Sequence, residues 1–330
     1  MGSPSIAVSR RDISFSLPYS YARGNDLACT VVRVEVRDGT WTGRGEGAPF
    51  ESFFETSADE AVRALEHLAA TVPPAALDRQ ALLTLMEPGA ARNALDAALW
   101  DLEAKRGGRP VWELAGTPQP KPLEIMTTIS MADPDQFAQE LAESRHARIL
   151  KLKLGSDHDT ERLERTRARR PDAHLVVDVN GGWSPATLRA MLPVLERHDV
   201  RMLEQPVSRH DEECLRGLPH PMPIVADESF QHEDDLDRVT GLYDGINVKL
   251  DKCGGLTAAL RIFARARARG LRLMLGCLPG SSLSSAVGFH AAQCAEFVDL
   301  DAHLRLVEDV EPRMTATGGW LQPPAPELWG

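Results

Sequence analysis

The 330-residue sequence lacks closely spaced cysteine pairs, long apolar runs and an excess of basic residues. Its five cysteines are odd in number and far apart, with no CxxC spacing, so we expect reduced thiols and no structural zinc site. No stretch approaches the roughly 20 apolar residues of a membrane span, and the first residues, MGSPSIAVSRRDISF, contain no apolar signal core. These absences predict a cytoplasmic protein with no membrane partner.

The charge balance is acidic, with 37 Lys and Arg against 48 Asp and Glu and a net charge of −11. The basic residues are scattered over helical segments, so no stripe exists that could follow a phosphate backbone, and nucleic acid is not expected as a partner. With 43% hydrophobic and 26% charged residues, the composition is that of a globular chain with one large domain or two unequal ones.

The N-terminal part has the pattern of strands followed by helices. Residues 9–50 alternate as strands do, around an Asp38-Gly39 hairpin signal. The segment SADEAVRALEHLAATV then opens with Ser57 as a helix cap, and ARNALDAALWDLEAKRGG has helical spacing and stops at Gly107-Gly108. This order predicts an α+β region.

From about residue 123 a different pattern repeats, in which short apolar runs are separated by helical segments. The eight runs are LEIMTTISM, RILKLKLG, HLVVDVNG, VRMLEQP, PIVADES, GINVKLDKCGG, RLMLGCLPGS and FVDLDAHL. Eight such units predict an α/β fold with a closed (β/α)₈ TIM barrel. The alternative is an open doubly wound sheet, but its phosphate fingerprint would require glycines after the first strand, and TTISMADP contains none.

Polar side chains end these runs, at the edge where a barrel of this type places its catalytic groups. They are Lys151, Lys153, Asp178, Asn180, Glu204, Asp227, Glu228, Lys249, Asp299 and Asp301. Taken singly, Lys-x-Lys could mark a solvated strand face, and an aspartate could cap a helix. Three consecutive strands that end in Asp178, Glu204 and Asp227 are harder to explain, because three buried like charges need a cation. All-oxygen ligation predicts Mg²⁺ in preference to calcium or zinc.

The lysines suggest a reaction. In an eight-stranded barrel the second and sixth strands stand opposite each other, so Lys153 and Lys249 would approach a substrate from its two faces. Mg²⁺ and a second ammonium would lower a lysine pKa from about 10.4 towards roughly 7 to 8, which suits a general base. Two opposed lysines allow a 1,1-proton transfer through a metal-stabilised enediolate.

Together these residues resemble the enolase superfamily, its muconate-lactonizing subgroup and, within it, the dipeptide epimerases typified by the L-Ala-D/L-Glu epimerases. The fragments that carry the resemblance are ARNALDAALWDLEAK, LKLKL, VVDVN, MLEQP, ADES, NVKLDKCGGL, LMLGC and DLD. The implied roles are an acid/base pair (Lys153, Lys249), Mg²⁺ ligands (Asp178, Glu204, Asp227), support of the substrate carboxylate (Lys151), binding of the substrate α-ammonium (Asp299, Asp301) and lining of the substrate pocket (Thr128, Cys277).

The resemblance also implies a capping domain, residues 1–120 with 312–330 packing back on it, which closes over a barrel of residues 121–311 through the loop SYARGND. Members that prefer glutamate at the second dipeptide position place an arginine on this loop, where our alignment has Asp26; Arg23 aligns with a different position. An aspartate would repel a glutamate side chain and attract a basic one. Alternatively, Asp26 faces solvent and the pocket accepts apolar or uncharged residues.

The function that the resemblance implies is that of an isomerase: a Mg²⁺-dependent dipeptide epimerase that inverts the α-carbon of the C-terminal residue of a small-molecule dipeptide. One alternative is N-acylamino-acid racemase or o-succinylbenzoate synthase activity, whose substrates lack the α-ammonium. Another is a catalytically silent metal- or peptide-binding relative, which would have no reason to retain both lysines and all three carboxylates. The outer surface of such barrels often supports homo-oligomers, and the sequence leaves the assembly state open.

Overall fold

The computed structural model describes residues 5–21, 24–50, 56–73 and 76–330. Its centre is a parallel eight-stranded sheet whose strands follow one another in chain order. The strands are β5 (Met126–Ile129), β6 (Ile149–Lys153), β7 (His174–Asp178), β8 (Val200–Glu204), β9 (Ile224–Ala226), β10 (Gly245–Lys249), β11 (Arg272–Gly276) and β12 (Phe297–Asp299). Since β12 lies beside β5, the sheet nearly closes, and the predicted barrel is confirmed.

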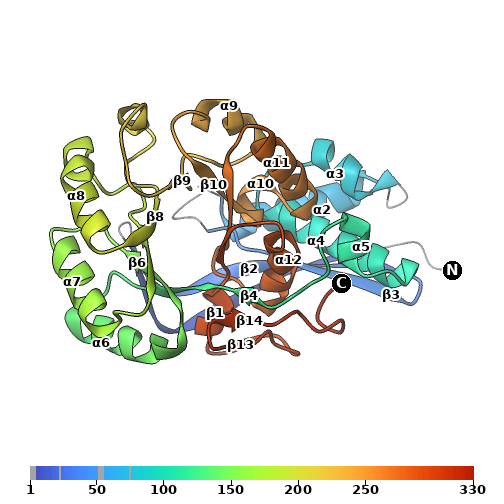
Figure 1. Cartoon of the computed structure of the whole chain (residues 1–330). Helices are drawn as coiled ribbons and strands as arrows, with labels where there is room; N and C mark the ends of the chain where they lie inside the picture. Colours follow the sequence, from blue (N-terminus) through green and yellow to red (C-terminus); the bar gives the residue numbers. More distant parts are fainter. Residues whose placement is uncertain (1–4, 22–23, 51–55, 74–75) are drawn as a thin grey trace.

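Helices surround this sheet and connect its strands (Figure 1). They are α6 (Pro134–Glu143), α7 (Asp159–Arg169), α8 (Pro185–Arg197), α9 (Leu236–Val239), α10 (Leu250–Cys253), α11 (Leu256–Ala268) and α12 (Ser282–Ala292). The short 3-10 turns η2 (Ser144–His146), η3 (Glu212–Leu215), η4 (Glu233–Asp235) and η5 (Ala302–Arg305) complete the connections. None of the helices in the described part of the chain is long and apolar enough to cross a membrane.

The N-terminal part is an antiparallel sheet with helices on one face. Its strands are β1 (Ser5–Tyr21), β2 (Gly24–Asp38) and β3 (Trp41–Gly47), and its helices are α2 (Ala58–Thr71), α3 (Arg79–Leu85), α4 (Ala90–Gly107) and α5 (Val111–Ala115). Gly39 makes the hairpin turn with φ of 61°, and Ser57 caps α2 in a capping box with Glu60. The α4 helix ends at Gly108 in the left-handed conformation, as its Gly-Gly pair predicts.

Strand β3 lies unusually close to α4. A Cβ atom at Gly43 or Gly45 would lie 2.0 Å from a carbonyl oxygen of α4, and a Cβ at Gly47 would lie 2.1 Å from one. The sequence WTGRGEG therefore presents a face without side chains, against which the helix backbone packs directly.

The same helix joins the N-terminal part to the barrel. Asn93 Nδ2 donates to Asp251 Oδ1 at 2.7 Å, next to the end of β10, and Trp100 Nε1 donates to Thr257 Oγ1 of α11 at 3.0 Å. All four residues are buried, so these hydrogen bonds form in an environment from which water is excluded. The α4 segment, which carries part of the family resemblance, thus holds the N-terminal part against the barrel.

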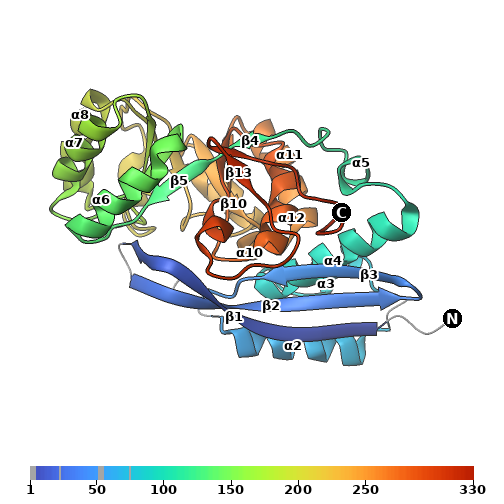
Figure 2. The same ribbon diagram turned by 90° about the horizontal axis from the view of Figure 1, so that it is seen from below.

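The C-terminal residues return to α4. A small antiparallel sheet of β4 (Leu123–Glu124), β13 (Ala316–Thr317) and β14 (Trp320–Leu321) is followed by the chain end. Trp329 Nε1 donates to the carbonyl of Ala97 at 3.1 Å, and the Gly330 amide donates to Asp101 Oδ1 at 2.9 Å. Figure 2 shows the N-terminal sheet running beneath the barrel, with the end of the β1–β2 ribbon beside α6.

Candidate active site

The barrel interior has an apolar floor. Met126, Val176, Met202, Val225 and Met274, one from each of five strands, form a buried cluster inside the ring. The residues between them along each strand face the surrounding helices, because side chains alternate across a strand. Only inward positions nearer the carboxyl ends of the strands remain for polar groups.

Three carboxylates occupy such positions on neighbouring strands. Asp178 pairs in register with Glu204, and Asp227 follows the end of β9; all three are buried. Lys151 Nζ lies 3.0 Å from Asp178 Oδ2 and 2.8 Å from Glu204 Oε2. Burial and the charge of Asp178 raise the pKa of Glu204 to about 8, whereas Lys151 and Lys153 outweigh burial and lower the pKa of Asp178 to about 2. Without a further cation, burial and Asp178 therefore favour the protonated form of Glu204 near neutral pH.

The chemistry of this cluster fits a hard divalent cation. Among the described residues no three His, Cys, Asp or Glu side chains have the spacing of a metal site, since the Lys151 ammonium lies between two of the carboxylates. Glu204 Oε2 is buried and contacts the Lys151 ammonium, so a cation already meets this oxygen, which could serve as a metal ligand. All-oxygen donors on adjacent strand ends suit Mg²⁺, and a divalent ion would favour the ionised form of Glu204. Asp178, Glu204 and Asp227 are the residues that would hold it.

Two further lysines reach this cluster from opposite sides of the barrel. Lys153 Nζ lies 2.7 Å from Asp178 Oδ2 and 3.0 Å from Asn180 Oδ1, and Lys249 Nζ lies 2.7 Å from Asp227 Oδ2. Their strands, β6 and β10, are separated by three strands in either direction around the ring. The structure thus places the two lysines on opposite walls, as the spacing of the runs predicts.

The protonation of Lys249 depends on the carboxylates around it. Burial favours the neutral amine, but Asp227 and Glu204 outweigh it and raise the pKa of Lys249 above its usual range. With only the chain's own side chains around it, Lys249 is an ammonium ion. A lowered lysine pKa in the metal-loaded site stays a prediction.

Two supporting residues escaped the sequence reasoning. Asn247 Nδ2 donates to Glu204 Oε1 at 2.7 Å, and Lys252 Nζ donates to Asp227 Oδ1 at 2.7 Å. The sequence could have pointed to Asn247, because this polar residue lies two positions before Lys249, on the same inward face of an otherwise apolar strand. No sequence pattern marks Lys252, which lies in the short α10 turn and reaches Asp227 only through the fold.

The last two strands contribute a second acidic region. Asp299 Oδ2 accepts from Lys151 Nζ at 2.6 Å, while its buried Oδ1 accepts no hydrogen bond from any residue that the structure describes. Asp299, Asp301 and Cys277 line a small cavity of about 30 Å³, and Phe15 of β1 also lines it. Burial and the charge of Asp299 raise the pKa of Asp301. Burial also raises the pKa of Cys277, so this residue is a neutral thiol.

Thr128 and Asp26 lie at the edges of this arrangement. Thr128 is buried on β5, and its backbone N–H donates to Asp301 Oδ2 at 2.7 Å. Asp26 is half-buried on β2, near the tip of the β1–β2 ribbon. On the β1 strand of this ribbon, the backbone carbonyl of Pro18 accepts a hydrogen bond from the Gln136 side chain of α6. Residues 22–23 of the loop SYARGND, which include Arg23, lie outside the described residues. The role of Asp26 therefore stays a prediction.

Comparison with known proteins gives the family. A model described as the mandelate racemase/muconate lactonizing enzyme N-terminal domain matches residues 5–116, and one described as enolase C-terminal domain-like matches residues 134–326. The chain belongs to this family. Its membership confirms the resemblance to the enolase superfamily that the strand-end residues suggested.

Relatives of the chain include named epimerases. It is 37% identical to an L-Ala-D/L-Glu epimerase of Escherichia coli strain K12 over 308 residues, which are 92% of this chain and 95% of the relative. It is 36% identical to a hydrophobic dipeptide epimerase of Roseobacter litoralis, over 88% of each chain. A crystal structure of an enolase family member from Agrobacterium tumefaciens, with homology to dipeptide epimerases and with bound sodium and L-Ala-L-Glu, superposes with a TM-score of 0.95 at 38% identity, covering 99% of this chain and 100% of that one.

Proposed function

We propose that this protein is a Mg²⁺-dependent dipeptide epimerase that inverts the α-carbon of the C-terminal residue. The observation that carries the proposal is the opposed pair Lys153 and Lys249, whose ammonium groups each lie 2.7 Å from a carboxylate at the mouth of the barrel. The epimerases among the relatives support the reaction class.

The two lysines divide the proton transfer. One amine takes the proton from the α-carbon on one face, and the ammonium on the opposite wall returns a proton to the other face, so the configuration inverts. Asn180 fixes the Lys153 side chain by accepting from it, and Lys151 provides a third positive charge beside the place of the substrate carboxylate. Bound by the three strand-end carboxylates, Mg²⁺ would supply the positive charge that makes an α-proton beside a carboxylate acidic enough to remove.

The second acidic region favours a substrate with a free α-ammonium. Asp299 has a buried oxygen that no described residue meets with a hydrogen-bond donor, and Asp301 lines the same small cavity. A buried carboxylate oxygen of this kind is costly unless a donor or a cation meets it. An N-acylated amino acid would bring no charge to this region, so we favour dipeptides over the N-acylamino-acid and o-succinylbenzoate alternatives.

We further propose that the enzyme uses L-Ala-L-Glu poorly and prefers basic or apolar residues at the second position. The support is the presence of Asp26 where the resemblance would place an arginine. Its carboxylate would repel a glutamate side chain. A screen in which glutamate is clearly the best second residue would refute this preference.

A dipeptide library incubated in D₂O tests the reaction. Mass spectrometry should detect incorporation of deuterium at the α-carbon for a subset of L-Ala-L-Xaa dipeptides, and Lys153→Ala and Lys249→Ala should each abolish epimerisation. Exchange that persists unchanged in both variants would refute the two-base assignment. If Mg²⁺ binds but no dipeptide exchanges, the catalytically silent alternative gains support.

The Asp301→Asn variant tests the ammonium site. We expect it to raise KM for dipeptides strongly, because a neutral amide no longer attracts the α-ammonium. An N-acylated substrate, if one is accepted, should be affected little. Equal effects on both substrates would contradict ammonium binding at this site.

A further inference from the structure

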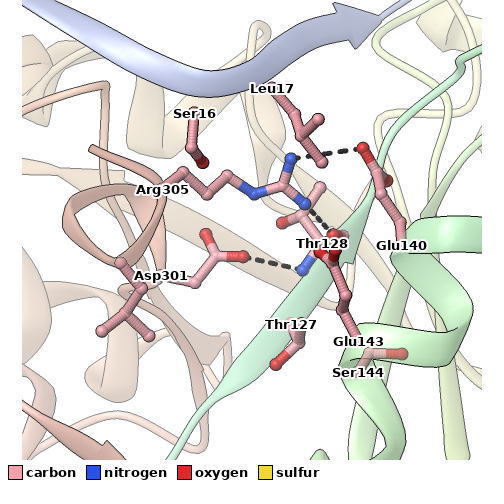
Figure 3. Close-up of a pocket in the computed structure, with 10 residues that line it drawn as sticks. Ser16, Leu17, Thr127, Thr128, Glu140, Glu143, Ser144, Asp301 and Arg305 are labelled. Carbon is pink, nitrogen blue, oxygen red and sulfur yellow. Dashed lines mark hydrogen bonds and ion pairs between the residues drawn. The ribbon is translucent and has the colours of Figure 1, made fainter. Parts of the chain in front are cut away.

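The barrel has a seam between its last and first strands. In the described part of the chain, β12 lies beside β5 without the ladder of hydrogen bonds that joins the other neighbouring strands. Two side chains take its place at Thr128, one from Asp301 just before η5 and one from Arg305 at its end: Asp301 Oδ2 accepts the Thr128 N–H at 2.7 Å, and the Arg305 guanidinium donates to the Thr128 carbonyl (Figure 3). Asp301 and Arg305 thus close the barrel at Thr128, which lines a neighbouring cavity together with both of them.

Arg305 extends across the seam to the next helix. Its Nη1 donates to Ser130 Oγ at 3.1 Å and lies 3.6 Å from Glu140 Oε1 on α6; Figure 3 marks the contact with Glu140. Glu140 Oε2 in turn accepts the Ser130 N–H at 2.5 Å. The arginine side chain is only 16% exposed, so its charge acts through a medium with little water.

Charged groups face Asp301 from several elements. Burial, followed by the charge of Asp299 of β12, raises the pKa of Asp301, while Arg305 and hydrogen bonding from Thr128 oppose the rise. Lys151 of β6 offsets the charge of Asp299 at 2.6 Å, and Cys277 after β11 is a neutral thiol. The Lys151 ammonium neutralises Asp299, whereas the Arg305 guanidinium is the charge that favours the ionised form of Asp301.

We propose that Arg305 is a positioning residue that fixes Asp301 against β5 and keeps it ionised, so that Asp301 can receive the α-ammonium of the substrate. This inference rests on the proposed function. Glu140 moderates the effect, because its carboxylate shares the charge of Arg305. The substrate class that follows is a dipeptide with a free, protonated N-terminus.

An experiment without turnover tests the charge state first. In protein labelled with ¹⁵N-threonine, the Thr128 amide, assigned by its loss in Thr128→Val, reports on the ionisation of Asp301 as the pH is lowered. In Arg305→Met the midpoint of this titration should move to higher pH by roughly one unit, because a nearby cation is removed. In Glu140→Gln it should move to lower pH, since Arg305 then acts without its partner.

Arg162→Met is the matched control. Arg162 of α7 donates to the carbonyls of Ser130 and Ala132, so it supports the same strand end from the other side. If Arg305 merely holds the loop together, both arginine variants should shift the titration alike. An unchanged midpoint in Arg305→Met, or equal shifts in the two variants, would overturn the proposal.

Kinetics give the second measurement. At a pH below both titration midpoints, Arg305→Met should raise the KM for dipeptides about tenfold, because a shift of one pH unit lowers the ionised fraction of Asp301 tenfold there, with kcat within about twofold of the wild type. At a pH well above both midpoints the two KM values should converge. Arg305→Lys should restore most of the affinity. A fall in kcat at unchanged KM would contradict the assignment. If the Thr128 titration shifts as expected while the wild-type protein turns over no dipeptide, the proposed function fails and the role of Arg305 in ionising Asp301 stands.

Discussion

Replacing Lys249 by methionine should abolish epimerisation at a modest cost in stability. Lys249 Nζ lies 2.7 Å from one oxygen of Asp227, and Lys252 Nζ lies 2.7 Å from the other, so the buried carboxylate keeps an ammonium partner in the variant. Leaving a buried charge unpaired costs about 3 to 5 kcal/mol, whereas losing one of two charged hydrogen bonds should cost about 1.5 to 3 kcal/mol. Loss of the acid/base group should lower kcat by about 10²- to 10⁴-fold.

Lys252→Met is the matched control, because it removes the same charge from the same carboxylate. Lys252 also donates to the backbone carbonyls of Asp227 and Asn247, at 2.8 and 2.9 Å. Its loss should therefore destabilise the protein more, by about 3 to 5 kcal/mol, yet leave measurable epimerisation. Urea unfolding followed by circular dichroism gives the stabilities, and ¹H NMR of a dipeptide in D₂O gives the rates. The reasoning is refuted if Lys249→Met keeps activity within tenfold of the wild type, or if Lys252→Met is the less active variant at equal folded concentration.

Three further predictions concern the supports of the site and its metal. In Gly276→Ala the new Cβ would lie 2.6 Å from Asn247 Oδ1, so the Asn247 amide that orients Glu204 should shift. Calorimetry should then show that the affinity for Mg²⁺ falls about tenfold, and an unchanged affinity would contradict this. In Gly45→Ala the Cβ would lie 2.0 Å from a backbone carbonyl of α4, so urea unfolding should show that the free energy of unfolding falls by about 3 kcal/mol or more. In the control Gly107→Ala the Cβ meets open space, so this free energy should be unchanged or higher. Treatment with EDTA should remove activity and added Mg²⁺ should restore it, whereas full activity after EDTA would argue against a metal cofactor.

The fold was readable because its pattern is local. Each of the eight apolar runs contains one barrel strand, and the polar residues that end them lie at one edge of the ring. A period of two separates inward from outward side chains, so Lys151 and Lys153 could be assigned to one face without knowledge of their partners. From the sequence, the glycines of WTGRGEG were predicted only as part of a strand. Their role in packing against α4 could not be predicted, because that helix lies about 50 residues further along the chain.

The site was readable only in part. Its lysines and carboxylates were named from strand ends, and the structure brings them within hydrogen-bonding distance. The direction of the Lys249 pKa was not readable, because it depends on how near Asp227 and Glu204 come in three dimensions. The role of Lys252 was not predictable either, because its contacts join the segment after β9 to strand β10.

The sequence by itself determined the barrel, the order of its strands and the chemical groups at its mouth, because strand periodicity and residue type are properties of short segments. The tertiary structure decided which carboxylate each ammonium neutralises, and it decided that Arg305 and Asp301 close the seam at Thr128. These outcomes depend on distances between residues from distant parts of the chain and on how far burial strengthens their charges, neither of which a linear pattern contains.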